Sequence, residues 1–372
     1  MKTMDNRKYY KISEISDILK ITTRTIRYYE QEGLLSSVTR TPGGMRLFTE
    51  KDVELIKQIR GLQKDEFLSL TQIKEQLTNE SVENIDQEEN IVIVTDSTAS
   101  LPKMIIDDLN IRIIPLNIIL DGKTYKDGVD INAIDFFNKV NGSNYKATTA
   151  PPSQESLVQL YQSLAKSGYT KILSIHIANH WSETFATAQS AAKQVSNVHI
   201  EVVDSFNTGL GMGLLAYVAA KMAKEKKKFS YIIAEIKEKR KRCWQIMYIN
   251  SLDYFIQGVD KTTIQGELLN TLLDYKPILF YNPEYGKFTV TDRTNNPEEA
   301  VTKLLKSIKD YEKEYGRIFR YVGITHSYFY QEAYELMKRI KATFPYVNVI
   351  IAEASPIINT YVGFYSMSMS IC

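Results

Sequence analysis

The stretch that most constrains the fold is IVIVTDSTASL (91–101), an apolar run rich in β-branched residues that turns polar at Thr95. Such a run predicts a strand buried on both faces. Three more apolar runs, at 111–120, 171–177 and 199–206, are also followed by polar loops and helical patterns. This repeated order of strand, polar loop and helix predicts an α/β fold with a parallel sheet.

Length and charge distribution indicate more than one domain. A chain of 372 residues exceeds one comfortable hydrophobic core, so two or three domains are expected. The whole chain has a net charge of only +2, which does not indicate a strongly basic protein. Residues 1–48, however, carry nine Lys/Arg against five Asp/Glu, a net charge of +4. The basic excess is therefore concentrated at the N-terminal end.

The two cysteines, Cys243 and Cys372, form neither a disulfide framework nor a metal-binding pattern. This usage suits a reducing cytoplasm. The N-terminal residues MKTMDNRKYYK are polar, unlike a signal peptide, and no apolar run is long enough to span a bilayer. We therefore expect a cytoplasmic protein without a membrane span.

The first 77 residues have the pattern of a winged helix-turn-helix. An amphipathic helix with Ser13 as its expected cap is followed, after a tight turn, by TTRTIRYYEQ (22–31), capped by Thr22 or Thr23. The segment TRTPGGMRLF (39–48) then predicts a hairpin, with Gly43 and Gly44 at its tip. Thr49 with Asp52 resembles a capping box for a third helix, and Ser69 is expected to cap a fourth.

This module resembles the MerR family of winged-helix transcription regulators. The resemblance rests on YKISEISDILKITTRTIRYYEQEGLL (10–35), PGGMRLF (42–48), TEKDVELI (49–56) and FLSLTQIKEQL (67–77). It implies duplex DNA as a partner, bound mostly through phosphates. The DNA-binding residues that it implies are Thr23, Arg24, Arg27, Tyr28, Arg40 and Arg46. The alternative is a helical protein-interaction domain. That interpretation does not explain why basic residues occur on both the second helix and the wing.

The segment TNESVENIDQEEN (78–90) is polar and acidic, without the heptads of a dimerisation helix. It is predicted to be a linker between the module at 1–77 and an α/β body. If the chain is a homodimer, as proteins that read two half-sites are, its dimer contacts come from elsewhere in the chain. The body is expected to contain an N-terminal lobe at 91–228 and a C-terminal lobe at 229–372.

Small polar side chains follow the predicted strands of the body. They are Ser97, Thr98, Thr149, Asn179, Ser182, Asp204 and Ser205. Because the carboxyl ends of parallel strands share one edge of a sheet, we expect these side chains to converge on a crevice suited to a polar head group. Asp121, Asp127 and Asp130 do not have calcium-loop spacing and are expected to be solvated turn carboxylates.

The body resembles the DegV family of fatty-acid-binding proteins. The matching motifs are DSTASL (96–101), PLNIILDGKTYKDGVDI (115–131), TAPPS (149–153), WSETFATAQSA (181–191), VVDSFNTGLGMG (202–213), YKPIL (275–279) and ITHSYFYQEA (324–333). The resemblance implies two α/β lobes that enclose an acyl chain, with no metal or other cofactor. Its carboxylate would be held by Thr149 and by Asn179 or Ser182, with His326 from the second lobe. The complete expected lipid-binding set is Ser97, Thr98, Thr149, Asn179, Ser182 and His326.

Departures from the family pattern favour a sensor over a carrier. Ala150 and Ala178 replace serines and cannot donate to a carboxylate, and Asp260 replaces an arginine expected at the docking site of a fatty acid kinase. We therefore expect a DNA-binding transcriptional regulator with a lipid-sensing body. The alternative is a fatty-acid carrier that presents acyl chains to a kinase.

An enzyme is a third hypothesis, with Ser182 or Ser205 as nucleophile and His176, His180 or His326 as base. The chain has no G-x-S-x-G elbow and no Walker loop, and it contains only four histidines, without a clustered Cys/His set. We therefore expect a binding protein and not an enzyme.

Overall fold

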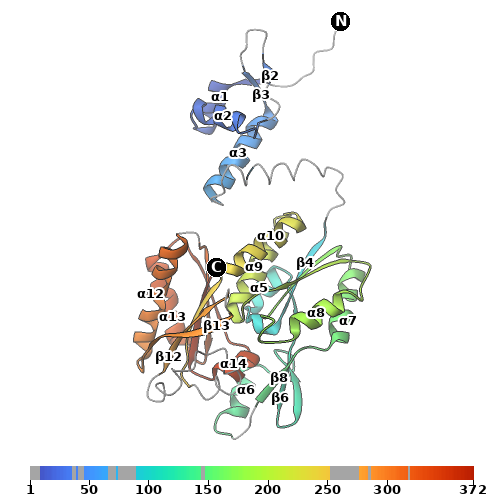
Figure 1. Cartoon of the computed structure of the whole chain (residues 1–372), viewed down its shortest axis with the longest axis vertical. Coiled ribbons are helices and arrows are strands. Elements are labelled where there is room, and N and C mark those ends of the chain that lie inside the picture. The colour runs from blue at the N-terminus through green and yellow to red at the C-terminus, as the bar shows by residue number, and fades with distance from the viewer. Residues whose placement is uncertain are drawn as a thin grey trace. The chain divides into compact units, whose positions relative to one another are not determined.

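The computed structural model describes residues 9–35, 39–40, 46–65, 73, 89–143, 147–251, 276–283, 286–316 and 319–372. The chain divides into two compact units, Met1–Glu88 and Glu89–Cys372, which we call the head and the body (Figure 1). The expected helix cap Ser69 lies outside the described residues. So do most of the predicted linker and the segment 258–262, which contains Asp260. The domain boundaries expected from the sequence stay predictions.

The described elements of the head are β1 (Tyr9–Lys11), α1 (Ile12–Leu19), α2 (Thr23–Gln31), β2 (Thr39–Arg40), β3 (Arg46–Thr49) and α3 (Glu50–Asp65). Strand β3 pairs antiparallel with both β1 and β2, which confirms the predicted hairpin. Ile15, Ile26 and Ile56 are fully buried between the helices. The head thus has its own hydrophobic core around a helix-turn-helix.

Two of the expected helix caps in the head are confirmed, and one is wrong. The Thr22 hydroxyl accepts a hydrogen bond from the backbone N–H of Thr25 at 3.1 Å, and the Thr49 N–H donates to the Asp52 carboxylate at 2.7 Å. Helix α1, however, begins at Ile12 after Lys11, and not after Ser13. The reason is that the Lys11 N–H donates to the Glu14 carboxylate at 2.6 Å, which closes the first turn earlier.

The body contains thirteen described strands and nine described helices. The strands are β4 (Ile91–Asp96), β5 (Arg112–Ile114), β6 (Asn117–Leu120), β7 (Lys123–Lys126), β8 (Ala147–Ala150), β9 (Lys171–His176), β10 (His199–Asp204), β11 (Trp244–Tyr248), β12 (Pro277–Asn282), β13 (Lys287–Arg293), β14 (Tyr321–Ser327), β15 (Asn348–Glu353) and β16 (Ser366–Ile371). The helices are α5 (Lys103–Asp108), α6 (Ala133–Val140), α7 (Gln154–Lys166), α8 (Thr184–Ala192), α9 (Gly209–Lys224), α10 (Phe229–Lys239), α12 (Pro297–Tyr315), α13 (Tyr330–Thr343) and α14 (Pro356–Val362).

The first lobe is a four-stranded sheet in the order β10-β9-β4-β5, and its pairings are all parallel, as predicted. Helices α7 and α8 cover one face, where Tyr161, Leu164 and Ala188 are buried. Helices α9 and α10 cover the other face. The run at 91–101 is the central strand β4, which is buried on both faces.

The second lobe is a six-stranded mixed sheet in the order β13-β12-β11-β16-β14-β15. Among the described strands of this lobe, only β14 and β15 pair in parallel, and the other pairings are antiparallel. Helices α12 and α13 cover one face of this sheet (Figure 1). The second lobe thus departs from the strand-and-helix repeat that the sequence of the first lobe suggested.

The single strand predicted at 111–120 is wrong, because the structure divides it at Pro115. Strand β5 joins the parallel sheet, whereas β6 forms a separate antiparallel sheet in the order β7-β6-β8. Proline has no N–H to donate and marks the ends of strands, which explains the division. The third sheet packs against α6 and α14, with Ile118 and Phe136 buried between them.

Helix α9 is the element shared by the two lobes. Its first eight residues, Gly209–Ala216, are all buried, and it contacts β4 of the first sheet as well as β14 and β16 of the second. An added Cβ at Gly213 would lie 2.4 Å from the backbone oxygen of Ala99, and one at Gly323 would lie 2.7 Å from the Leu210 Cβ. Glycine at these positions lets the helix approach both sheets closely.

The cysteine pair differs from the expectation. A disulfide joins Cys243 to Cys372, whose Cα atoms are 4.5 Å apart. The sequence separates these residues by 129 positions, and only the antiparallel register of β11 and β16, which places Trp244 opposite Ile371, brings them together. Among the described residues, no helix has the length and apolarity that crossing a bilayer requires.

We predict that Gly213→Ala destabilises the body. Alanine favours helices by about 1 kcal/mol over glycine, but the new methyl group would overlap the Ala99 carbonyl. Overpacking of this kind costs about 1–3 kcal/mol. Urea unfolding of the full chain should show a lower midpoint with an unchanged slope. An equal or higher midpoint would contradict the tight fit of α9.

Candidate functional site

A buried hydrogen-bond network fixes the ends of β4 and β9. The Asp96 carboxylate accepts from the Thr98 hydroxyl at 2.5 Å, from the Ile177 N–H at 3.0 Å, and contacts the His176 Nδ1 at 3.0 Å. The His176 Nε2 lies 2.8 Å from the Ser174 hydroxyl, which also contacts Tyr161. These side chains are all fully buried. Their hydrogen bonds satisfy one another, so the network holds the loops after the two strands in place.

The network has the order of a hydrolytic triad, Ser174–His176–Asp96, but not its accessibility. None of these side chains lines the cavity described below, and each is 0 % exposed. Ser182 and Ser205, the two possible nucleophiles predicted from the sequence, are also unsuited to catalysis. The Ser205 hydroxyl is buried and donates to the Asn207 carbonyl at 3.0 Å, and Ser182 contacts Thr184 at 2.8 Å. Among the described residues, no serine is both accessible and paired with a histidine base, as nucleophilic catalysis requires.

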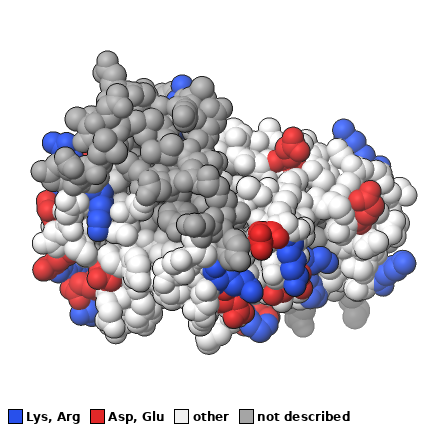
Figure 2. Space-filling view, turned by 90° about the horizontal axis from the view of Figure 1, so that it is seen from below, with Lys and Arg blue, Asp and Glu red and all other residues white. Residues whose placement is uncertain are grey.

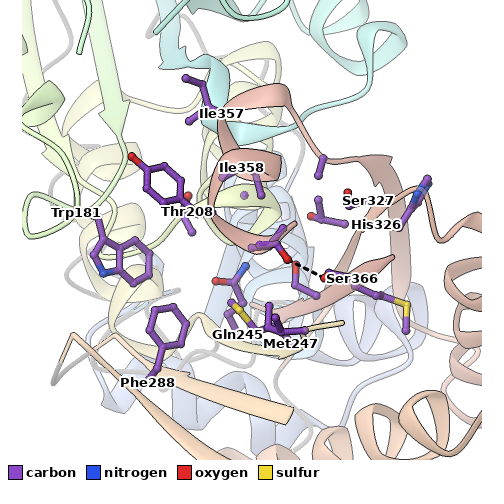
Figure 3. Close-up of a pocket in the computed structure, with 18 of the residues that line it drawn as sticks. Trp181, Thr208, Gln245, Met247, Phe288, His326, Ser327, Ile357, Ile358 and Ser366 are labelled. Atoms are coloured by element: carbon purple, nitrogen blue, oxygen red, sulfur yellow. Dashed lines mark hydrogen bonds between the residues drawn. The ribbon is translucent and has the colours of Figure 1, made fainter. Parts of the chain in front are cut away.

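A cavity of about 310 Å³ lies between the two lobes, where the loop after β9 and the start of α9 meet α14 and the inner face of the six-stranded sheet (Figure 3). Its apolar wall is formed by Ile177, Trp181, Met247, Ile249, Phe288, Ile357, Ile358, Val362 and Met367. Its polar lining consists of His180, Thr208, Gln245, Thr325, Ser327, Tyr361, Ser366 and Ser368, with His326 at the border. The volume is within the range of ligand pockets, and the mostly apolar wall suits an aliphatic ligand.

Aromatic side chains form one end of this cavity. Trp181 stacks on Phe288 with ring centroids 5.3 Å apart, and Tyr281 packs against both. The Tyr281 hydroxyl donates to the Phe206 carbonyl at 2.8 Å and lies 3.2 Å from the His180 Nε2. Burial raises the pKa of Tyr281 and lowers the pKa of His180, so both side chains are neutral near pH 7.

Of the lipid-binding residues predicted from the sequence, His326 lines the cavity, and Thr149 is linked to it through one hydrogen bond. The Thr149 hydroxyl is hydrogen-bonded to the hydroxyl of Tyr361, a cavity-lining residue of α14. Thr149 lies on β8. The double proline of TAPPS follows this strand and separates it from α7. The pair places two hydroxyl groups, each both donor and acceptor, at one edge of the cavity.

The other predicted lipid-binding residues have local partners. The Ser97 hydroxyl accepts from the Leu116 N–H at 3.1 Å, and Thr98 contacts Asp96. The Asn179 N–H donates to the Asp204 carboxylate at 3.3 Å, and Ser182 accepts from the Thr184 N–H. None of these four lines the cavity. Their role in lipid binding stays a prediction, and the structure gives each of them a role in shaping a loop.

His326 borders the cavity, but its ring points away from the aromatic end (Figure 3). Because side chains alternate along β14, the ring is on the opposite face from Thr325 and Ser327, where it lies 5.6 Å from the ring of Tyr330. Burial lowers its pKa, so the imidazole is neutral at pH 7. A neutral imidazole supplies no charge to an anionic head group.

Several residues that line the cavity were not predicted from the sequence. Trp181, Gln245, Tyr361 and Phe288 come from four separate segments, which meet only where the loop after β9 of the first lobe faces the second sheet and α14. One signal was available in the sequence SMSMS (366–370). Its strict alternation predicts a strand with one small polar face, and Ser366 and Ser368 do line the cavity.

Asp127 corrects the expectation of solvated turn carboxylates, since it is only 2 % exposed. It lies beside Ser97 and beside Ser355, the N-cap residue of α14. Burial raises the pKa of Asp127 to about 7, which outweighs the lowering effect of the neighbouring hydroxyls. No cluster of His, Cys, Asp and Glu that could hold a metal ion occurs in the described ranges.

In the head, Arg24, Arg27 and Tyr28 are exposed on α2, at the helical spacing that places them on one face. Thr23 is half-buried at the start of this helix. The Arg46 Nε is 2.5 Å from the Glu30 carboxylate, so this arginine already has an acidic partner. Arg40 lies on β2, opposite Arg46 in the hairpin register. The structure therefore brings basic residues of the helix and the wing strands into one small domain.

On the face of the body shown in Figure 2, basic and acidic side chains are interspersed. The described part of this face has no extended basic field of the kind that binds nucleic acid. In contrast, two arginines of α2 are exposed together on the head.

The fold and the cavity define a class of protein with two α/β lobes and an enclosed, mostly apolar pocket. Residues 90–372 match the family model described as an uncharacterised protein of the DegV family, and the chain belongs to this family. Residues 10–80 match the model of the MerR HTH family regulatory protein. The expected combination of a MerR-type helix-turn-helix and a DegV domain is thus confirmed.

Three similar proteins each cover about three quarters of this chain. A DegV domain-containing protein of Caldanaerobacter subterraneus is 31% identical over 277 residues, which is 74% of this chain and 96% of the relative. The crystal structure of DegV, a fatty acid binding protein from Bacillus subtilis, has a TM-score of 0.68 at 26% identity and covers 76% of this chain and 99% of its own. A stearic acid-binding protein from Eubacterium ventriosum, at 21% identity and a TM-score of 0.68, covers 75% of this chain and 97% of its own and has the same fold.

We predict that Asp127 makes the stability of the body fall as pH rises. Its folded pKa of about 7 exceeds the unfolded value of 3.8. The folded chain therefore binds more protons between these values, and its free energy of unfolding falls across that window by on the order of 1 kcal/mol per pH unit. Asp127→Asn should remove this component.

Denaturant unfolding at pH 4.5 and pH 7.5, compared between the wild type and Asp127→Asn, measures the effect. The control is Asp121→Asn, which changes an exposed carboxylate near the same sheet and should follow the wild type. A wild-type chain whose pH dependence matches that of Asp127→Asn would show that Asp127 ionises freely.

Proposed function

We propose that this chain is a DNA-binding transcriptional regulator whose body binds a fatty acid or a related lipid. The observation that carries the proposal is the presence, in one chain, of a MerR-type head with exposed arginines and a DegV body with an apolar cavity. The fatty acid binding named for the Bacillus subtilis protein, whose similarity spans the whole body, supports the choice of ligand. The proposed function is binding and signalling, without catalysis.

The described head residues support phosphate contacts by Arg24 and Arg27, with Tyr28 beside them. Thr23 at the N-terminal end of α2 is proposed to lie near base edges. Arg40 and Arg46 are proposed to contact the backbone from the wing. MerR-type heads that read two half-sites act as dimers, so we infer a homodimer whose contacts lie in the body.

The cavity supports an acyl chain whose head group lies at the Thr149–Tyr361 hydroxyl pair. Burying a chain contributes about 0.8 kcal/mol per methylene, so chain length governs the affinity. Ala150 and Ala178 cannot donate to a carboxylate, and no cationic side chain lines the cavity among the described residues. We therefore expect weak discrimination between a free acid and a neutral alcohol of equal length.

The first experiment tests the head. Replacing both Arg24 and Arg27 by alanine in the full chain should weaken binding to all duplex sequences and reduce the slope of log affinity against log salt by about two. Gel shifts over a salt series measure the slope. The control Lys103→Ala removes an exposed charge from the body and should leave the slope unchanged. An unchanged slope in the double variant would exclude these two contacts.

The second experiment tests the body. Calorimetric titration of the delipidated full chain with acids of increasing length should show affinity that rises until the cavity is full, with alcohols close behind. Thr149→Val should lower the affinity roughly tenfold by removing a head-group hydrogen bond, whereas the exposed neighbour Thr148, as Thr148→Val, should have no effect. Affinity that does not change with chain length would refute lipid binding.

A further inference from the structure

The wall of the cavity opposite α14 is unusually polar for a site that holds an aliphatic chain. Three adjacent strands contribute polar side chains to it, among them Gln245 from β11, Ser368 from β16 and Thr325 from β14. In the strand register, Ser368 lies directly opposite Thr325, and Gln245 lies opposite Ser370, two residues further along β16. Thr208, just before α9, lines the cavity beside them. We call these four residues the polar corner.

Gly209 leaves the space at this corner open. A Cβ added to Gly209 would come within 3.5 Å of the Gln245 Nε2 and 3.7 Å of the Thr325 Oγ1. Both atoms therefore converge on the point where a side chain is missing. The backbone there has φ +54°, in the left-handed region that favours glycine. The conformation therefore favours glycine at this point, whereas an added Cβ would make only ordinary contacts with the two side chains.

Two oxygens of the polar corner have no hydrogen-bond partner within the described part of the chain. They are the Gln245 Oε1 and the Thr208 Oγ1, both of which are buried. Gln245 as a whole is only 2 % exposed, and its side chain points into the cavity in Figure 3. Leaving a buried polar group unpaired costs about 1–3 kcal/mol, and folded proteins pair nearly all such groups.

An unsubstituted acyl chain cannot satisfy these groups, because a methylene neither donates nor accepts a hydrogen bond. A hydroxyl does both, so it can pair with the amide of Gln245 in either of its orientations and with the Thr208 hydroxyl. The corner is also distinct from the Thr149–Tyr361 pair, which is on β8 and α14. A ligand that meets both places needs polar groups at two positions along its length.

We propose that the cavity selects an acyl ligand that carries a hydroxyl group on its chain, which binds at the polar corner. The proposal rests on the proposed lipid-binding function and specifies the class of lipid. Gln245 and Thr208 are then specificity-determining residues. A site with buried groups that need a hydroxyl rejects the analogue that lacks it, which gives the cavity a basis for discrimination between two chains of equal length.

The test titrates the delipidated full chain with octadecanoic acid and with the 2-, 10-, 12- and 18-hydroxy derivatives of the same acid. One position of the hydroxyl should raise the affinity about tenfold over octadecanoic acid, because one good buried hydrogen bond has about that effect. The other positions should bind more weakly than octadecanoic acid, since they place a hydroxyl against the apolar wall.

Two variants locate the effect. In Gln245→Leu and in Thr208→Val, the affinity for the best hydroxy acid should fall to about the affinity that the same variant has for octadecanoic acid, so that the tenfold preference is lost. The matched control Gln189→Leu changes an exposed glutamine of α8 and should keep the full preference.

The preference of the wild type decides the proposal even where a variant fails to fold. If octadecanoic acid binds as tightly as every hydroxy acid, the corner holds only water and the proposal is overturned, while the proposed lipid binding stands. If Gln245→Leu and Thr208→Val both retain the preference, the hydroxyl binds elsewhere and the assignment is also overturned. If no acid of any kind binds, the proposed function itself fails and this inference fails with it.

Discussion

The body depends on the close approach of one helix to two sheets. Helix α9 is buried along its first half and packs on β4 from one lobe and on β14 and β16 from the other. Glycines at 213 and 323 remove the side-chain atoms that would hold these surfaces apart. Protein interiors transmit small displacements because they are close-packed. A shift of the second sheet is therefore transmitted to the end of β4 and the turn that follows it.

The cavity lies where this helix begins. Thr208 and Gly209 form the N-terminal end of α9 and also part of the cavity wall. A ligand in the cavity thus contacts the one helix that both lobes share. If ligand and DNA each change the affinity of the other, the two effects must be equal in free energy, because coupling between binding sites is reciprocal.

The sequence predicted the first lobe better than the second, for a physical reason. Strands buried on both faces, such as Ile91–Asp96 and Lys171–His176, are unbroken apolar runs, and these were recognised together with their parallel order. One such run, however, is divided at Pro115 into two strands that belong to different sheets, because proline has no N–H to donate. The apolar pattern alone did not predict this division. In the second lobe, antiparallel pairing between distant segments left no comparable local signal.

The candidate site was predicted only at its edge. Thr149 was predicted from the TAPPS motif that resembles the DegV family, and its partner Tyr361 lies 212 residues away in sequence. Ser97 and Thr98 were predicted as hydroxyl residues after a strand, yet their hydroxyls hold Leu116 and Asp96. Residue type therefore identified candidates, whereas burial and register decided between them. Cys243 and Cys372 illustrate the same limit, since only strand pairing reveals their proximity.

The positions of the two tryptophans have a practical consequence. The chain contains only Trp181 and Trp244. Trp181 lines the cavity with its ring stacked on Phe288, whereas Trp244 packs among Phe280, Tyr311 and Tyr315, away from the cavity lining. An indole that exchanges water for hydrocarbon emits at shorter wavelength. The protein therefore carries an intrinsic fluorophore at its cavity and a second one that serves as an internal reference, so occupancy can be followed in the unlabelled chain.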